Sequence, residues 1–146
     1  MLCLGPRAIF LLPQVNVFAG SDFRLFAEIV GDGGVVRAIP APGAASQARS
    51  YFDRMNEWAR EEGAPGMGWI SFADGGGKGP ISNRLDKMRM MKLKEMTDCN
   101  DGDGLFFAAG TEGEAAQLAG LARLKIGHDL GLIEKDAYRF CWIVDY

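Results

Sequence analysis

The densest group of positive charges in this sequence lies between positions 84 and 94, where it could contact phosphates. Its five cations are Arg84, Lys87, Arg89, Lys92 and Lys94. Lysine and arginine attract the phosphates of nucleic acids through charge, which makes RNA a candidate ligand. The competing interpretation is a solvated face between methionines that fill the core. From the residues alone we favour it, because most runs of charge are only that.

A glycine-rich segment from Asp74 to Pro80 offers a second possible anion site. Its sequence, DGGGKGP, could place backbone N–H groups and Lys78 around a phosphate. A Walker loop, however, needs serine or threonine after its lysine to reach magnesium, and Gly79 stands there. We therefore favour a flexible connector between a strand and a helix. A small nucleotide hydrolase that depends on Lys78 is kept as a third hypothesis.

Two further patterns could bind metal or move protons, and neither fits its template. The segment 98–103 (DCNDGD) resembles a calcium loop, but Gly102 and Ala109 occupy positions that need oxygen ligands, so we exclude calcium. His128 is the only histidine, and its neighbour Asp129 would not face it on a helix. A solvated histidine at a helix end is the better interpretation. We predict no catalytic residue, no metal site and no cofactor-binding residue in this chain.

The composition bounds the class of protein. A chain of 146 residues with 48% hydrophobic and 24% charged residues fits one globular domain with a real core. The formal net charge of −3 argues against a polybasic nucleic-acid or membrane binder, though it permits a local basic patch. Cys3, Cys99 and Cys141 are far apart and odd in number, which indicates reduced thiols in a cytoplasmic protein. No apolar run approaches the roughly 20 residues that span a bilayer.

Hydrophobic patterns in the first half predict a β-hairpin followed by a helix. The segment 23–30 (FRLFAEIV) is rich in aromatic and β-branched residues, as strands are. A glycine-rich turn then precedes a second strand at 35–39, ended by Pro40. Ser46 could cap a helix that runs to about Glu62, with apolar residues at the helical period.

The second half alternates strands with helices. We expect a strand at 67–73, a less regular helix at 81–96, a strand at 105–109, a helix from about 111 to 130 and a strand at 140–144. The unbroken apolar run 105–109 is typical of a strand in the middle of a sheet. Thr111 and Glu114 have the spacing of a capping box at the start of the last helix. Gly120 and Gly127 share a face of that helix, which indicates close backbone packing.

The apolar positions of these two helices are predicted to form the core. In the helix at 81–96 they are Ile81, Leu85, Met88 and Met91. In the last helix they are Ala115, Leu118, Ala119, Ala122, Ile126 and Leu130. Long helices, few strands and a hairpin together predict an α+β fold in two layers.

Several blocks of the sequence also resemble one family. These blocks are VFAGSDF (17–23), VRAIPAPG (36–43), KGPI (78–81), DGDGLFF (101–107), GLAR (120–123), GLI (131–133) and WIVD (142–145). Their order and spacing resemble those of the insert, or GAD, domain of bacterial-type aspartyl-tRNA synthetases. The blocks look most like those of alphaproteobacterial members. The likeness covers residues 17–146. Residues 1–16 are left as an unassigned leader or a remnant of an upstream segment.

The resemblance implies a fold and a context. The fold would be an α+β two-layer sandwich of the GAD or DCoH-like type, with an antiparallel sheet of about four strands and two main helices. The parent enzyme would attach aspartate to tRNA with ATP and magnesium, as a cytoplasmic homodimer. Neither class II motif 2 nor motif 3 is found here, so no catalytic residue can be carried over. The chain would be an accessory part of that synthetase, near the acceptor side of tRNA.

Two alternatives stay open besides the nucleotide hydrolase. One is a free-standing interaction or regulatory module that shares the sandwich. The other is the GAD domain of a tRNA-dependent amidotransferase subunit, although the strand 142–145 favours the synthetase. If the domain touches tRNA, the candidate RNA-facing residues are Lys78, Arg84, Lys87, Arg89, Lys92 and Lys94.

Overall fold

The strand predicted at 105–109 is the centre of the fold. The computed structural model describes residues 15–136, and in that part of the chain four strands form one antiparallel sheet in the order β1-β4-β2-β3. The strands are β1 (Val35–Ala41), β2 (Gly68–Ala73), β3 (Gly76–Lys78) and β4 (Gly104–Gly110). β4 pairs with β1 on one side and with β2 on the other. The strands predicted at 35–39, 67–73 and 105–109 are thereby confirmed.

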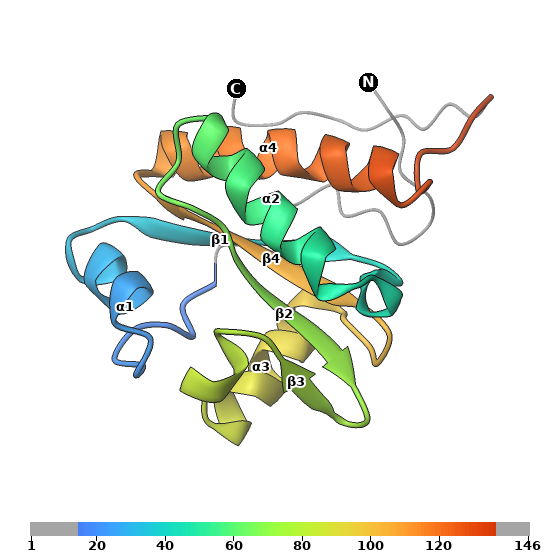
Figure 1. Cartoon of the computed structure of the whole chain (residues 1–146). Helices are drawn as coiled ribbons and strands as arrows, with labels where there is room; N and C mark the ends of the chain where they lie inside the picture. The colour runs from blue at the N-terminus through green and yellow to red at the C-terminus, as the bar shows by residue number, and fades with distance from the viewer. Residues whose placement is uncertain (1–14, 137–146) are drawn as a thin grey trace.

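Helices cover both faces of this sheet (Figure 1). The two long helices, α2 (Arg49–Glu61) and α4 (Glu112–Asp129), lie on one face. The shorter helices α1 (Arg24–Gly31) and α3 (Lys87–Thr97) lie on the other. The α+β class and the antiparallel sheet are confirmed. α2 and α4 are the two main helices.

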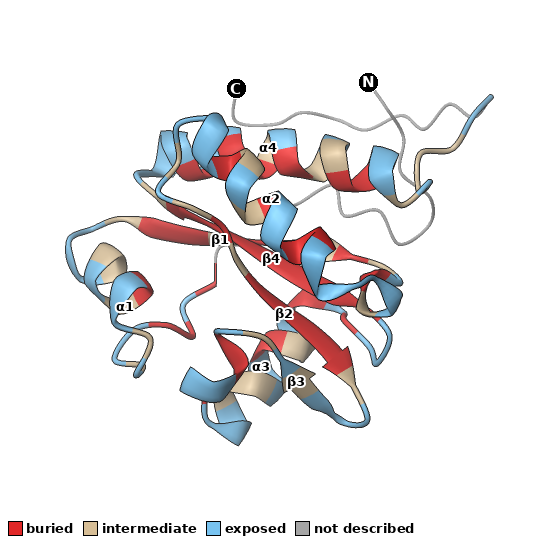
Figure 2. Ribbon diagram, in the orientation of Figure 1, coloured by how far each residue is buried: buried red, intermediate tan, exposed pale blue. Residues whose placement is uncertain are grey.

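Neighbouring residues of β4 belong to two separate hydrophobic cores, because successive side chains of a strand point to opposite faces. Phe106 stacks on Phe52 of α2, with ring centroids 5.5 Å apart. Phe107 meets Phe18 edge to face at 5.2 Å on the other side. Buried residues therefore run along the middle of the sheet and line the inner sides of the helices (Figure 2).

The first predicted strand, 23–30, is wrong: the structure has helix α1 there. Phe23, Phe26 and Ile29 recur every three residues, so one face of a helix can carry them to the core that contains Phe18 and Phe107. Packing overrides the strand propensity of these residues. The predicted hairpin is wrong for the same reason, and β1 pairs instead with distant β4.

Helix α2 is confirmed, but its predicted cap is not. Ser46 ends a short 3-10 helix, η1 (Ala44–Ser46), and its hydroxyl donates to the carbonyl of Gly43 at 2.8 Å. The N-cap of α2 is Ala48, without a side-chain cap. Gly63 follows the helix with φ of 89°, the left-handed conformation expected of a terminating glycine.

The glycine-rich segment is a β-hairpin, not a flexible connector. Asp74 and Gly75 both have positive φ, 54° and 74°, and turn β2 back into β3. Lys78 lies inside β3 and not at a helix N-terminus, so the geometry does not support a phosphate loop of the Walker kind. The following helix is shorter than predicted. A second 3-10 turn, η2 (Ser82–Arg84), precedes α3, and Asp86 caps α3 by accepting from Arg89 N at 2.8 Å.

Helix α4 opens with the predicted capping box between Thr111 and Glu114. Its predicted inner face is buried except for the partly exposed Leu130. Close packing at Gly120 is wrong, because a Cβ there would meet nothing within 4 Å, whereas Gly127 is buried. The strand predicted at 140–144 lies outside the described residues. No helix among residues 15–136 is both long and apolar enough to cross a membrane.

Replacing Tyr51 by phenylalanine should stabilise the domain. The Tyr51 side chain is only 6% exposed, and its hydroxyl oxygen has no hydrogen-bond partner among the described residues. Burial, followed by the charge of Asp129, raises the pKa of Tyr51 to about 12. We expect Tyr51→Phe to raise the free energy of unfolding near neutral pH by about 1 kcal/mol, measured by urea unfolding.

The same variant should change how the free energy of unfolding depends on pH in alkaline solution. Both states keep Tyr51 protonated below the unfolded pKa of 10.0, so its contribution is complete there. As the pH rises from that value toward about 12, the unfolded phenol ionises first and the wild-type free energy of unfolding falls. Tyr51→Phe should lack this part of the fall. Parallel stability curves for the two proteins over that range would contradict the burial argument.

Candidate nucleic-acid interface

The structure divides the six candidate cations into three groups. Lys78 is set apart by the pairing of β3 with β2, in which Lys78 lies opposite Ser71. Ile70 packs in the core beneath α1 and α3, so its neighbour Ser71 and the opposite Lys78 point to the α2 and α4 face. The other five cations lie on η2 and α3, across the sheet. Lys78 therefore does not belong to the same surface.

Two of the remaining five cations are engaged in holding the fold together. Arg89 contacts the carboxylate of Asp86 at 3.3 Å and donates to the carbonyl of Ala19 at 3.2 Å, which ties the N-terminal loop to α3. Lys94 donates to Asp101 at 2.7 Å, and its ammonium lies 5.0 Å from the centre of the Phe72 ring. These side chains have structural partners that a ligand would need to displace.

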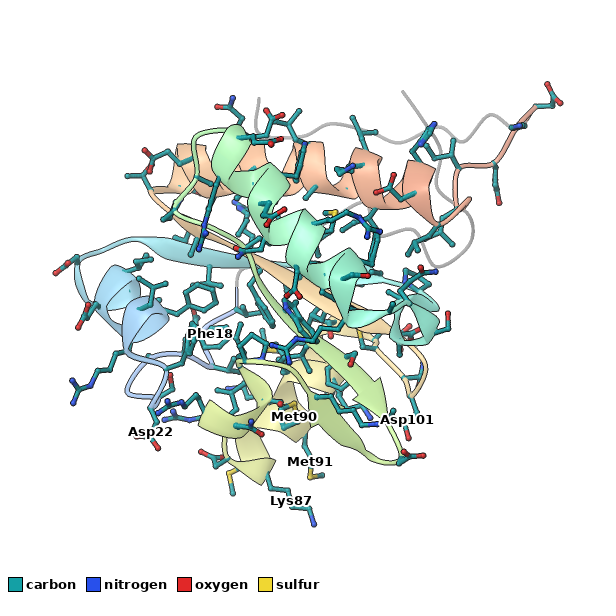
Figure 3. The ribbon with its side chains drawn as sticks, in the orientation of Figure 1. Phe18, Asp22, Lys87, Met90, Met91 and Asp101 are labelled. Carbon is teal, nitrogen blue, oxygen red and sulfur yellow. The ribbon has the colours of Figure 1, made fainter. Side chains whose placement is uncertain are left out.

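Arg84, Lys87 and Lys92 are different. All three are exposed, and none forms an ion pair with another residue of the 15–136 range. Lys87 projects away from the sheet beside Met91 (Figure 3). These three cations are the part of the predicted set that is free to contact phosphates.

The methionines of α3 do not behave as the favoured interpretation of this segment requires. Met88 is 81% exposed and Met91 is 64% exposed, so the prediction that they belong to the core is wrong. Only Met90 packs against the core, next to Gly77 of β3. Ile81 and Leu85 are buried as predicted, but from the segment before the helix. The outer face of α3 thus carries cations and exposed thioethers together.

A hollow of about 650 Å³ adjoins the start of this surface. It is lined by Ser21, Asp22, Arg24, Pro80, Asn83 and Arg84. Its two guanidinium groups favour an anion, while the Asp22 carboxylate opposes one. The strand predicted at 23–30 gives no reason to single out Arg24, so the sequence pattern does not identify it. The helical spacing of Phe23, Phe26 and Ile29 is the signal that places Arg24 on the outside.

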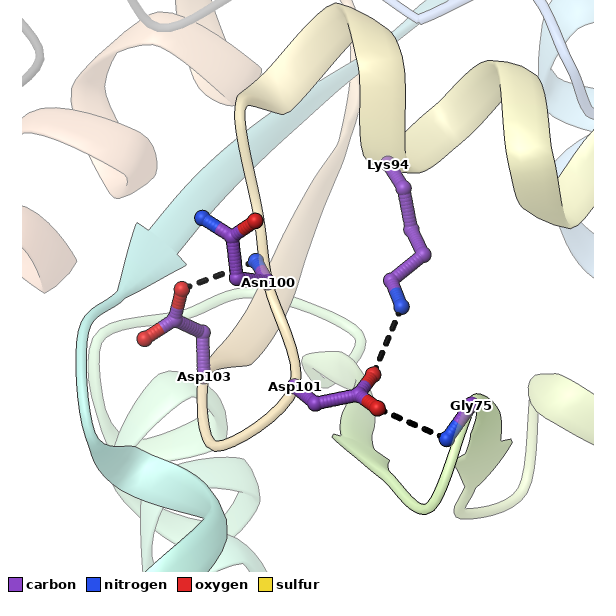
Figure 4. A network of polar contacts seen from close by, with 5 residues as sticks. All are labelled: Gly75, Lys94, Asn100, Asp101 and Asp103. Atoms are coloured by element: carbon purple, nitrogen blue, oxygen red, sulfur yellow. Dashed lines mark hydrogen bonds and ion pairs between the residues drawn. The ribbon is translucent and has the colours of Figure 1, made fainter.

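The acidic turn at 101–103 fixes α3 relative to the sheet (Figure 4). Asp101 accepts from Lys94 Nζ at 2.7 Å and from the Gly75 amide at 2.7 Å, so it joins α3 to the β2–β3 hairpin. These hydrogen bonds, that from Lys94 first, lower the pKa of Asp101. Asp103 accepts from the amides of Asn100 at 2.9 Å and Gly43 at 3.0 Å. Two carboxylates of the segment that resembles a calcium loop, Asp101 and Asp103, thus accept hydrogen bonds from α3, from the β2–β3 hairpin and from the loop at Gly43.

The opposite face of the domain offers weaker candidates. A hollow of about 560 Å³ between α2 and α4 is lined by residues of both charges, and two of them, Lys125 and Asp129, already pair at 3.3 Å. The His128 side chain is 86% exposed at the end of α4, as predicted, with its Nδ1 3.9 Å from Asp129. We therefore place the candidate interface on η2 and α3.

Comparison with known proteins points to one family. A family model described as the GAD domain matches residues 26–119. The chain is 54% identical over 138 residues to an aspartate–tRNA(Asp/Asn) ligase of Paramagnetospirillum magneticum, covering 94% of this chain and 16% of that protein. The corresponding ligase of Acidiphilium cryptum is also 54% identical over 138 residues, covering 94% of this chain and 23% of the relative. The ligase of Zymomonas mobilis is 54% identical over 129 residues, covering 88% and 22%.

These relatives come from alphaproteobacteria, the group that the sequence blocks resemble. The chain spans less than a quarter of the length of each of them. The similarity therefore concerns one region of a much larger protein.

Removing the Asp103 carboxylate should destabilise the domain. In Asp103→Ala two partly buried amides, those of Gly43 and Asn100, lose their acceptor. We expect the free energy of unfolding to fall by about 3 kcal/mol, measured by urea unfolding. Asp32→Ala is the matched control, because Asp32 is exposed and accepts no side-chain hydrogen bond within residues 15–136. Equal effects of the two substitutions would show that the acidic turn does not hold these segments.

Proposed function

Because this chain belongs to the GAD domain family, we propose that it serves as an accessory domain of an aspartate–tRNA ligase. In the assembled enzyme it would lie near the acceptor side of the tRNA and present α3 to the RNA. The rest of the synthetase would be its covalent partner. The parent would be a cytoplasmic homodimer that charges tRNA with aspartate.

The observation that supports contact with RNA is the charge of one surface. The chain as a whole carries a formal net charge of −3, yet Arg84, Lys87 and Lys92 are exposed and unpaired among the described residues. A polyanion gains free energy at such a surface by releasing its counterions. Arg24 extends the positive surface into the adjoining hollow.

The chemistry of aminoacylation would be supplied elsewhere in the parent. Binding ATP and magnesium and activating an amino acid require positioned cations and carboxylates in a water-excluding pocket. Charged and polar side chains line most of the two hollows described above, and the buried carboxylate Asp103 accepts hydrogen bonds from two backbone amides. We assign no catalytic residue, cofactor or metal to this chain.

Of the alternatives, the ligase names of the relatives favour the synthetase over an amidotransferase subunit. A free-standing interaction module would use the same fold without RNA. Indifference of the pure domain to tRNA, together with a discrete homodimer in gel filtration, would favour that module.

Reversing two charges on α3 should weaken tRNA binding. We expect Lys87→Glu with Lys92→Glu to lower the affinity for an aspartate-accepting tRNA transcript by tenfold or more, in a filter-binding titration across salt concentrations. Each lost phosphate contact should also reduce the slope of log affinity against log salt by about 0.7–0.9.

The matched control reverses two exposed cations on the other face, Lys78→Glu with Arg60→Glu. It changes the net charge by the same amount and should retain the wild-type slope more closely. Equal losses in the two double variants would mean that the α3 surface has no special part in binding.

The isolated chain should not activate aspartate. We expect no aspartate-dependent exchange of pyrophosphate into ATP in the presence of magnesium, because no site for the adenylate is assigned to this chain. Exchange that requires aspartate and grows with the concentration of the pure domain would contradict the accessory role.

A further inference from the structure

We propose that the outer face of α3 holds an unpaired nucleobase of the RNA against two methionines. The face consists of Lys87, Met88, Met91 and Lys92, and we call these four residues the α3 patch. This inference rests on the proposed function and specifies the kind of RNA that the surface takes: a strand with an accessible base, in preference to an uninterrupted duplex.

The four side chains are neighbours because of their spacing on the helix. Met88 and Met91 are three residues apart, while Lys87 with Met91 and Met88 with Lys92 are each four apart, distances at which helical side chains meet. The two thioethers thus lie side by side with an ammonium group on either flank. Met91 and Lys87 point away from the sheet, whereas Met90 lies against it (Figure 3).

The exposure of the two methionines calls for an occupant. At 81% and 64% exposed, Met88 and Met91 contribute little to either core of the domain. Methionine is flexible and polarizable, adapts to binding surfaces and makes favourable contacts with aromatic rings. A nucleobase is such a ring. In a duplex its faces are stacked and inaccessible, so only an unpaired base can lie on the patch.

The charges around the patch favour a polyanion as that occupant. Lys87 and Lys92 flank the methionines, and Arg84 and Arg24 continue the positive surface through the hollow beside η2. A single carboxylate of a protein partner would satisfy one of these cations, whereas a run of phosphates can contact several in succession. Glu95 is exposed one turn beyond Met91, so the favourable region for phosphates ends there. At the other limit the Asp86 carboxylate, which precedes Lys87, is paired with Arg89.

Three labelled RNA hairpins that share one stem and one loop separate base contact from phosphate contact, because the loop bases contribute equally to all three. One is blunt, one carries a short 3′ single-stranded extension, and one carries the same extension without its bases. We expect the wild-type domain to bind the extended hairpin about tenfold more tightly than the blunt one in fluorescence anisotropy, because two thioether–ring contacts are added. The abasic extension should lose most of this gain while keeping its phosphates.

The double variant Met88→Gln with Met91→Gln tests the residues. Glutamine keeps the length of the side chain and its helix propensity, so the fold should be retained, which far-UV circular dichroism checks. We expect the variant to bind the blunt hairpin like the wild type and to lose the preference for the extended one. Met96→Gln is the control on the same helix, because Met96 is exposed but lies outside the patch.

The outcomes separate this inference from the proposed function. Salt-sensitive binding of all three hairpins with equal affinity would overturn the role of the methionines and leave the accessory RNA role standing. An unchanged preference in the Met88 and Met91 double variant would also overturn it. Absence of binding to every hairpin and to tRNA would refute the proposed function itself.

Discussion

The burial of β4 on both faces is the constraint on which the rest of the structure depends. Phe106 and Phe107 are adjacent and both fully buried, so one strand must be covered from two sides. The long helices α2 and α4 satisfy one side. The other side needs α1, α3 and the loop that carries Phe18, none of which is long enough to form a layer alone. The candidate interface is thus the outer surface of elements whose inner surface completes the core.

The two outer surfaces of the sandwich differ in how their charges are used. On α2 and α4, cations meet carboxylates one turn away, as in Arg49–Asp53 and Lys125–Asp129. On α3, Arg89 pairs with Asp86 and donates to the Ala19 carbonyl, and Lys94 pairs with Asp101. Lys87 and Lys92, on the outer side of the helix, have no carboxylate partner among the described residues. A domain of negative net charge can therefore still show a polyanion a locally positive face.

Local patterns were enough to predict the elements whose signal lies within a few residues. The apolar run of β4, the apolar period of α2 and the capping box of α4 each follow from short-range rules. The segment of α1 fits both the composition of a strand and the three-residue spacing of a helix face, and its packing against Phe18 and Phe107 selects the helix. The helix cap predicted at Ser46 is wrong because Ser46 belongs to the 3-10 helix η1, which ends before α2 begins.

The site was less predictable because it depends on register and on long-range hydrogen bonds. The sequence located the candidate cations of η2 and α3 but could not show that Lys78 points to the opposite face, which follows from its pairing with Ser71. Nor could the spacing of residues in the sequence show that Asp101 forms an ion pair with Lys94, or that Arg24 and Arg84 line the same hollow. The family resemblance added the fold and the synthetase context, and it was right about both the family and the sheet.

The two edges of the sheet explain how such a domain can be part of a larger polypeptide without pairing with strands of its neighbours. At one margin, β3 has only three residues and two of them are glycines. At the other, Val15 donates from its amide to the carbonyl of Val36 at 2.8 Å, and Pro40 has no amide hydrogen to offer. Within residues 15–136 neither border presents a long row of free backbone groups to another strand, so edge-to-edge aggregation is disfavoured.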